Sequence, residues 1–383
     1  MNVLIVLYYY RPHYSGLTIY TERLARALGA RGHQVTVLTS QFDANLPRYE
    51  QMDGVEVVRQ PVAFRISKGP IIPSFLPTAR KYLRQVQVVN LHLPQLDAAP
   101  IAMLARLMRV PVVTTYHCDL LLPTGLVHRL ANLASNTANH ITAMASNLMV
   151  TNTQDYAVHS PFLSKYLSKV KAIPPPAQMP PSRQSDIVAF REKYGIRKGD
   201  RVIGMVGRLA AEKGAEHLIK ALPKILEAIP GARAIHAGQS EHVMGEEGYA
   251  ARLRSQVEGL GAKWQFLGLI SDEELSAFFH ICDVVALPST NSTESFGMVL
   301  VEAMTCGTPG VTSDLPGMRM SVRKTGMGAT FPMGDEDALA EAIIDILQHG
   351  DQYQGNVPAI TQRYAPDTIA AEYEAIFDGL TGK

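Results

Sequence analysis

The chain has 383 residues, of which 46% are apolar and 19% are charged. This balance is typical of a folded globular protein and excludes a largely disordered chain. At about 150 residues per domain, the length predicts two domains. The cysteines Cys118, Cys282 and Cys306 are odd in number and far apart, which excludes a disulfide framework and a zinc site with closely spaced ligands.

The net charge of +1 conceals a basic first half and an acidic second half. Residues 1–180 hold 17 Lys and Arg against 8 Asp and Glu, a balance of +9, and residues 181–383 hold 19 against 27, a balance of −8. Between Val57 and Cys118 the only acid is Asp97. We expect this stretch to present a surface to anions. Its eight cations are Arg59, Arg65, Lys68, Arg80, Lys81, Arg84, Arg106 and Arg109.

The first half of the chain is predicted to alternate strands and helices. Short β-branched runs predict strands at 3–7, 35–39, 55–59, 86–91 and 110–115. Helical stretches between them include 18–31 and 98–109. The residues after Met1 are expected to form a strand, because neither a basic leader nor a cleavage site is present. No apolar run reaches the ~20 residues needed to span a bilayer, so we expect a cytoplasmic, reducing location.

The same pattern restarts after a proline-rich stretch at 173–181, which is the natural linker. Strands are predicted at 202–206, 232–237, 263–267, 284–287 and 308–312, and helices at 215–227, 249–260, 272–282 and 335–349. We therefore expect an α/β protein with two facing, doubly wound Rossmann-like domains and an inter-domain cleft. The predicted domains are residues 1–172 and 182–365, and a final helix at 366–383 is expected to pack back on the first domain.

The most informative segment runs from Glu294 to Ala303, directly after the strand predicted at 284–287. It opens a helix whose small residues Ser295 and Gly297 leave backbone N–H groups for an anion, which the helix dipole favours. Glu302, in the early turns, is placed to accept both hydroxyl hydrogens of a ribose, and Glu294 is free to meet a sugar. Either glutamate alone is better explained as a helix cap. Their position after a buried strand favours a binding site.

A second segment, Gly207 to Gly214, follows the strand predicted at 202–206. Arg208 can grip phosphate oxygens in a fork and Lys213 adds a point charge, which together suit a diphosphate leaving group. A solvated basic turn with Glu212 as the partner is the alternative.

These residues resemble glycosyltransferase family 4, whose members have the GT-B fold and retain anomeric configuration. The resemblance covers nearly the whole chain. It rests on Glu294-x-Phe296-Gly297-x4-Glu302-Ala303, on Gly207-Arg208-x4-Lys213-Gly214, on Pro12-x-x-Ser15-Gly16 and on Thr115-Tyr116-His117.

The resemblance implies a role for each matched residue. Glu294 would contact the hydroxyls of the donor sugar, Glu302 the ribose, and Arg208 and Lys213 the diphosphate. Ser15 and Gly16 would bring backbone close to the phosphates, and His117 would lie across the cleft beside the transferred sugar. The donor-binding set is completed by Gly268, Leu269 and Ile270, whose backbone would hold the base, and by Ser295, Phe296 and Gly297.

Three departures from the family pattern affect details of this set. Ser15-Gly16 stands where many members have two glycines, so a hydroxyl contact can replace part of the backbone approach. Pro174-Pro-Pro-Ala-Gln178 replaces the usual end of the first domain, and Gly238-Gln-Ser240 replaces a Gly-x-Gly turn, so no phosphate contact is assigned to Ser240.

His117 is interpreted as a donor-positioning group rather than a general base, because a lone histidine at a strand end is often structural. Asp119 is the only nearby candidate for a carboxylate nucleophile, and the family favours same-face attack. No metal or cofactor is implied: Asp335 and Asp337 open an amphipathic helix, where acids cap the first turn.

Other functions fit the sequence less well. A nicotinamide-binding enzyme would need Gly-x-Gly-x-x-Gly, and residues 11–17 offer one glycine. A sugar-nucleotide epimerase or hydrolase on the same fold, and a non-catalytic subunit that binds sugar nucleotides, are the alternatives. No nucleic-acid-binding module accompanies the basic first half.

The base and sugar of the donor stay open, and both UDP- and GDP-sugars fit. For the acceptor we expect a lipid, a lipid-linked molecule or a saccharide. Phe75-Leu76 and Tyr82-Leu83 interleave with Arg80, Lys81 and Arg84, a pattern typical of a basic amphipathic segment that rests on an anionic lipid surface. The alternatives are a soluble acidic acceptor and ordinary solvating charge.

Overall fold

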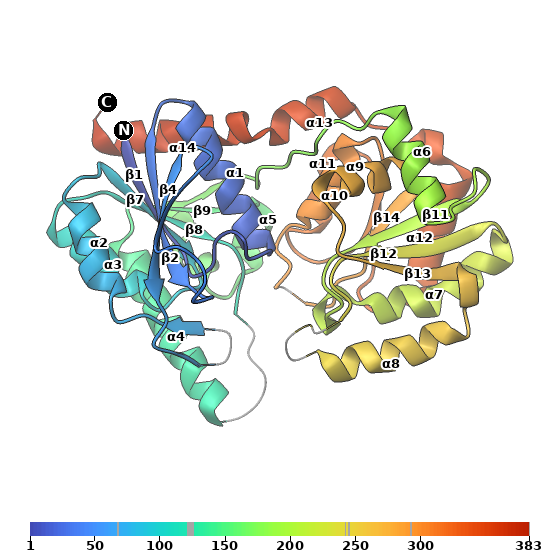
Figure 1. The fold of residues 1–383 in the computed structure, drawn as a ribbon, viewed down its shortest axis with the longest axis horizontal. Helices are drawn as coiled ribbons and strands as arrows, with labels where there is room; N and C mark the ends of the chain where they lie inside the picture. Colours follow the sequence, from blue (N-terminus) through green and yellow to red (C-terminus); the bar gives the residue numbers. More distant parts are fainter. Residues whose placement is uncertain (67–68, 121–125, 242, 244–245, 292, 383) are drawn as a thin grey trace. The chain divides into compact units, whose positions relative to one another are not determined.

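The computed structural model of the protein describes residues 1–66, 69–120, 126–241, 243, 246–291 and 293–382 (Figure 1). The chain forms two compact units. The first comprises Met1–Pro176 and Tyr364–Lys383, and the second Ala177–Arg363. Each is described below by itself.

The first unit is built on a largely parallel sheet. Its strands are β1 (Asn2–Val6), β2 (Gln34–Gln41), β3 (Tyr49–Met52), β4 (Val55–Pro61), β7 (Val88–Leu93), β8 (Val112–Tyr116), β9 (Leu148–Thr151) and β10 (Val170–Ala172). Among the described residues they are ordered β10-β9-β8-β7-β1-β2-β4-β3, and only β3 runs antiparallel to its neighbour. β5 (Phe64–Ile66) and β6 (Gly69–Ile71) form a separate antiparallel pair.

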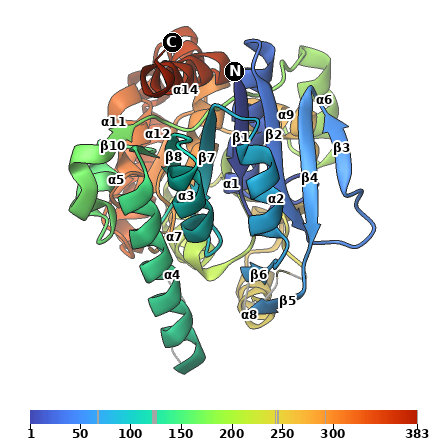
Figure 2. The ribbon, with the colours of Figure 1, turned by 90° about the vertical axis from the view of Figure 1, so that its left-hand side faces the viewer.

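Helices cover both faces of this sheet. They are α1 (Gly16–Ala30), α2 (Phe75–Leu83), α3 (Ala98–Leu107), α4 (Leu126–Ala145), α5 (Gln154–His159), the 3₁₀ helix η1 (Leu163–Lys169) and α14 (Pro366–Thr381). Figure 2 shows α2, α3 and α4 side by side in front of the sheet, where α2 and α3 contribute to its main apolar core. The C-terminal helix α14 packs along α1.

The second unit is built on a fully parallel sheet. Its strands are β11 (Arg201–Val206), β12 (Ala232–Ala237), β13 (Trp264–Gly268), β14 (Val284–Leu287), β15 (Gly310–Ser313) and β16 (Gly328–Phe331). In the described part of the unit their order is β13-β12-β11-β14-β15-β16. The direction of the order changes at β11, which is where ligands of such sheets bind.

Helices again flank the sheet of the second unit on both sides (Figure 1). They are α6 (Gln184–Lys193), α7 (Ala215–Ala228), α8 (Glu247–Glu258), α9 (Asp272–Ile281), α10 (Met298–Thr305), α11 (Arg319–Thr325), α12 (Glu336–Gln348) and α13 (Val357–Tyr364). Short 3₁₀ turns are η2 (Ala211–Lys213), η3 (Gly261–Lys263) and η4 (Gly350–Tyr353). α7, α8 and α12 share one apolar core with the sheet.

Local signals in the sequence set several helix starts. Ser271 caps α9 by accepting from the backbone N–H of Glu274 at 3.2 Å, and Glu274 reaches back to the N–H of Ser271. Asp335 caps α12 by accepting from the N–H of Ala338 at 2.9 Å, as the sequence predicts for an acid in that place.

The predicted α/β fold class of two parallel-sheet domains is confirmed. Periodicity did not predict six of the described strands, which are each three or four residues long: β3, β5, β6, β9, β10 and β16. In the described part of the chain, no helix is both long enough and apolar enough to cross a bilayer.

Candidate active site

In the second unit, the loops that follow β11 and β14 meet through a pair of opposite charges. The ammonium group of Lys213, at the end of η2, forms an ion pair with the carboxylate of Glu294. The backbone of the same loops is joined as well, because the N–H of Thr290 donates to the carbonyl of Glu212 at 3.0 Å. Residues 81 positions apart are thus held together at the carboxyl end of the sheet.

Glycine permits the close approach of these loops. Gly214 has a φ of +69°, and a Cβ atom there would lie 2.0 Å from the carbonyl oxygen of Pro288. Gly238, after β12, has a φ of +134°, and a Cβ there would lie 2.1 Å from the carbonyl oxygen of Gly207. Both positions require glycine for conformation and for space.

Glu294 is engaged on both carboxylate oxygens. One oxygen pairs with Lys213, and the other accepts from the backbone N–H of Gly297 at 3.1 Å. The prediction that the N–H of Gly297 is left for an anion is therefore wrong, because it donates to Glu294. Gly297 has a φ of +74° and immediately precedes α10.

The other predicted residues around α10 are buried. Glu302 is the fifth residue of the helix, and its side chain, like those of Ser295 and Phe296, is among the buried groups of the unit. A carboxylate held in this way is costly unless it has polar partners.

Arg208 lies in the loop after β11 and donates to the carboxylate of Glu212 at 2.8 Å. Its side chain is 41% exposed, so the guanidinium remains accessible. This pairing with Glu212 is the one expected from the alternative interpretation of the segment as a solvated basic turn. This exposed pair contributes little stability.

The segment predicted to hold a base follows β13. Gly268 adopts a φ of +72°, and its carbonyl accepts from the N–H of Gly238 at 2.8 Å. The side chain of Leu269 is 76% exposed, and Ile270 is partly exposed. This places the backbone of the segment beside the loops that follow β11 and β12.

In the first unit, Ser15 and Gly16 lie at the start of α1. The Ser15 hydroxyl accepts from the N–H of Thr18 at 3.2 Å, and Thr18 Oγ1 accepts from the N–H of Ser15 at 2.7 Å. This reciprocal capping box defines the helix start. Gly16 is exposed there, so its backbone can approach an anion.

His117 follows β8 and lies edge to edge with a second buried histidine, His92, near the end of β7. Nε2 of His117 lies 2.8 Å from Nδ1 of His92, and the ring centroids are 5.0 Å apart at an angle of 28°. Burial lowers the pKa of His117 to about 3 and holds the pKa of His92 well below its usual range. Both rings are therefore neutral near pH 7.

Asp119 is a hydrogen-bonding hub. Its carboxylate accepts from the hydroxyls of Tyr116 at 2.9 Å, Tyr156 at 2.9 Å and Ser160 at 2.8 Å. Burial and the negative charge of Asp119 raise the pKa values of both tyrosines, so they remain donors. The geometry supports a structural role for Asp119 rather than that of a nucleophile.

His92 was not predicted from the sequence as a site residue. The predicted strand ended at residue 91, whereas β7 extends to Leu93, and His92 is registered with Thr115 of β8. The sequence did contain a signal for this contact: two adjacent parallel strands each have a histidine at the carboxyl end, His92 in β7 and His117 after β8.

The predicted basic surface needs two corrections. Arg59 is buried, where it pairs with Glu50 at 2.6 Å and donates to the carbonyl of Arg11 at 2.9 Å, so it faces no external anion. Most of the apolar side of α2 is also unavailable to lipid, since Phe75, Tyr82 and Leu83 pack into the core and only Leu76 of the four predicted apolar residues is exposed.

Exposed cations remain on the neighbouring helices α2 and α3. They are Arg80, Lys81 and Arg84 at α2, and Arg106 and Arg109 at the end of α3. Lys68 lies outside the described residues. Beside these cations, the side chains of Leu107 and Met103 on α3 are 81% and 56% exposed.

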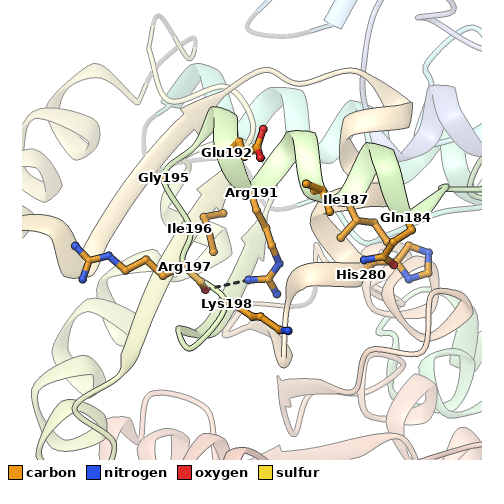
Figure 3. Close-up of a pocket in the computed structure, with 10 residues that line it drawn as sticks. Gln184, Ile187, Arg191, Glu192, Gly195, Ile196, Arg197, Lys198 and His280 are labelled. Carbon is orange, nitrogen blue, oxygen red and sulfur yellow. Dashed lines mark hydrogen bonds between the residues drawn. The ribbon is translucent and has the colours of Figure 1, made fainter.

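A hollow of about 1050 Å³ lies elsewhere in the second unit (Figure 3). It is lined by residues of α6 and the loop after it together with His280, and Figure 3 shows Arg191 directed at Arg197. None of the predicted site residues lines it. Within the described residues, no three His, Cys, Asp or Glu side chains gather as a metal site.

Comparisons with known proteins match both halves of the chain. The family described as "Glycosyl transferase 4-like domain" matches residues 15–159, and "Glycosyl transferases group 1" matches residues 186–359. An uncharacterized glycosyltransferase of Methanocaldococcus jannaschii is 28% identical over 97% of this chain and 96% of its own. The phosphatidyl-myo-inositol mannosyltransferase of Mycobacterium leprae is 27% identical over 95% and 92%.

Among solved structures, the Anabaena protein HepE in complex with UDP-glucose has a similar fold, with a TM-score of 0.75 at 22% identity over 99% of this chain and 100% of that one. One family match falls in each of the two units of the structure. The chain belongs to glycosyltransferase family 4 and has the GT-B fold.

Proposed function

We propose that the protein is a retaining hexosyltransferase that moves a sugar from a nucleoside diphosphate to a lipid, a lipid-linked molecule or a saccharide. The observation that carries this proposal is the ion pair between Lys213 and Glu294. It joins one residue suited to phosphate with one suited to sugar hydroxyls at the carboxyl end of a parallel sheet.

The diphosphate is held by Arg208 and Lys213. The exposed guanidinium of Arg208 offers two parallel donors to phosphate oxygens, and Lys213 adds a compact positive charge. Both positive charges stabilise the transition state more than the bound donor, because negative charge develops on the leaving diphosphate. They take the place that a metal ion has in other transferases, so we propose that the reaction is metal-independent.

The rest of the donor contacts the segments around α10 and β13. Glu294 fixes Lys213 and accepts hydroxyl hydrogens of the sugar, while the buried Glu302 accepts those of the ribose. The backbone of Gly268, Leu269 and Ile270 holds the base. Backbone contacts of this kind suit more than one base, which keeps UDP- and GDP-sugars as candidate donors.

In the first unit, the exposed backbone of Gly16 at the start of α1 approaches the phosphates, and His117 positions the transferred sugar. Same-face attack, with the leaving phosphate taking the proton of the acceptor, explains retention without a protein nucleophile. The hydrogen bonds that occupy Asp119 support this route over a covalent one.

The acceptor is proposed to lie at an anionic membrane. Support comes from the exposed cations of α2 and α3 next to Met103 and Leu107. The mannosyltransferase of M. leprae is named for a phosphatidylinositol acceptor, which also favours a lipid. Cations with adjacent apolar side chains are what peripheral association with anionic lipid requires.

The proposal is tested by offering the purified protein a panel of UDP- and GDP-sugars, and measuring thermal shift and nucleotide release with and without acceptor lipids or saccharides. We expect release that depends on an acceptor and persists in EDTA. Donor consumption without acceptor would indicate a hydrolase or epimerase, and no donor binding would contradict the assignment.

A further inference from the structure

The contacts around His92 and His117 in the first unit indicate which ring nitrogen of each histidine carries a hydrogen. Nδ1 of His92 lies 2.8 Å from Nε2 of His117 and 3.1 Å from Oγ1 of Thr21. Thr21 Oγ1 also lies 2.9 Å from the carbonyl oxygen of Leu17. A carbonyl oxygen can only accept, so the single hydroxyl hydrogen of Thr21 is directed at Leu17.

This hydrogen bond determines the tautomer of His92. With the Thr21 hydroxyl hydrogen directed at Leu17, its oxygen accepts from His92, which assigns the ring hydrogen of His92 to Nδ1. Nε2 of His92 is buried and has no hydrogen-bond partner among the described residues. A neutral ring that carries its hydrogen on Nδ1 leaves a lone pair rather than an N–H at that position.

We infer that His92 is a positioning residue that fixes the ring of His117 with its hydrogen on Nδ1. The N–H of His92 is shared between Thr21 and His117, so Nε2 of His117 accepts. This inference deepens the proposed function, on which it rests for the role of His117.

The edge-to-edge contact of the two rings and a neighbouring tyrosine hold the geometry. The two imidazoles lie nearly parallel, and the ring of Tyr20 stands edge-on to His117, with centroids 5.0 Å apart at 88°. Ring packing of this kind restricts rotation of His117. The lowered pKa values of both histidines agree with neutral rings that have one hydrogen each.

One consequence concerns catalysis. Nε2 of His117 is engaged by His92, and Nδ1 already carries a hydrogen. Neither ring nitrogen of His117 is then available to take a proton from the acceptor. The proton of the acceptor must then leave by another group, in agreement with transfer to the departing phosphate.

The tautomer can be observed without any assay of activity. In the full chain labelled with ¹⁵N-histidine, long-range ¹H–¹⁵N correlations separate protonated from unprotonated ring nitrogens, and His117→Gln assigns the signal. We expect His117 with hydrogen on Nδ1 in the wild type. A hydrogen on Nε2 would overturn the inference, whether or not the protein proves to be a transferase.

Substitutions of His92 test its part. His92→Asn keeps an N–H near the position of Nδ1 and should preserve the tautomer of His117, whereas His92→Leu should allow the other tautomer and lower kcat by about 10-fold to 100-fold with a smaller change in KM for donor. His349→Asn, at an exposed site, is the control. An unchanged His117 spectrum in a folded His92→Leu protein would also overturn the inference.

Discussion

The hydroxyl of Tyr373 lies 2.8 Å from the hydroxyl of Tyr20, although 353 residues separate them. Tyr373 belongs to the C-terminal helix α14, and Tyr20 to α1. Thr115 donates to Oδ1 of Asn90 at 3.0 Å, so the contact of 2.9 Å between Tyr373 and Thr115 requires Tyr373 to donate. The chain of donors therefore runs from Tyr20 through Tyr373 and Thr115 to Asn90.

Removal of the middle hydroxyl tests this chain. Tyr373→Phe leaves the buried Tyr20 hydroxyl without its acceptor, so we expect a loss of about 1–3 kcal/mol in the free energy of unfolding. Urea denaturation measures it. Tyr49→Phe, at an exposed tyrosine of the same unit, should change stability little. Equal stability of the two variants would show that the hydroxyl chain contributes nothing.

The ion pair of the candidate site gives a second prediction. Lys213→Met and Glu294→Gln should each lower kcat by about 100-fold or more, because each removes a charge that acts on the transition state. The fold should persist, since both side chains are partly exposed. Lys193→Met removes an exposed ion pair with Glu274 in the same unit and is the control. Near-normal turnover of both site variants would contradict the assigned roles.

The glycine at position 214 gives a third prediction. Gly214→Ala places a Cβ atom 2.0 Å from the carbonyl of Pro288 and must separate the loops that carry Lys213 and Glu294. Gly195→Ala is the matched control: its φ is +64°, but nothing lies within 4 Å of the added atom. In both variants the left-handed backbone conformation lowers the free energy of unfolding by about 1–2 kcal/mol. Only Gly214→Ala should also lose donor binding, as isothermal titration would show.

A buried histidine in the second unit predicts a pH dependence of stability. Burial lowers the pKa of His236 to about 4, below its ordinary value of 6.5. Between these values the unfolded chain binds more protons, so stability falls as the pH falls. We expect His236 to account for a loss of about 2 kcal/mol between pH 7 and pH 5.

His236→Leu should reduce that loss by the same amount. Urea denaturation of both proteins at the two pH values measures the difference. His349→Leu, which removes an exposed histidine, controls for the change in composition. If the variant and the wild type lose stability equally, the titration of His236 does not contribute.

Much of the fold could be predicted from the sequence, because continuous apolar runs mark buried parallel strands. β12 and β14 begin and end at the predicted residues. β16 (Gly328–Phe331) was missed because four residues with one β-branched side chain carry too little signal. The motif around Glu294 was recognised because its residues are consecutive in the sequence.

The contacts of the site could not be predicted in the same way. The pairing of Lys213 with Glu294 depends on the two loops meeting, which Gly214 permits through its backbone conformation and its missing side chain. The pairing of His92 with His117 depends on the register of β7 and β8. Such contacts arise between distant segments, and periodicity within one segment contains no information about them.

The last prediction concerns the proposed membrane surface. With Phe75, Tyr82 and Leu83 in the core, α2 offers lipid its cations and, of its predicted apolar residues, only Leu76. Binding should therefore be mainly electrostatic, with the exposed side chains of Met103 and Leu107 adding a smaller apolar part. We expect co-sedimentation with phosphatidylglycerol vesicles at low salt, weaker binding as salt rises, and little binding to phosphatidylcholine vesicles.

Two triple variants separate a specific surface from general charge. Arg80→Gln, Lys81→Gln and Arg84→Gln together should abolish most of the binding to anionic vesicles. The matched control carries the same loss of charge at exposed cations of the second unit: Lys198→Gln, Arg252→Gln and Lys324→Gln. Because attraction at a membrane depends on charges within about 10 Å of its surface, the control should still bind if α2 faces the lipid. Equal loss of vesicle binding in both triple variants would show that binding depends only on net charge. If the wild-type protein does not bind anionic vesicles, a soluble acceptor is favoured.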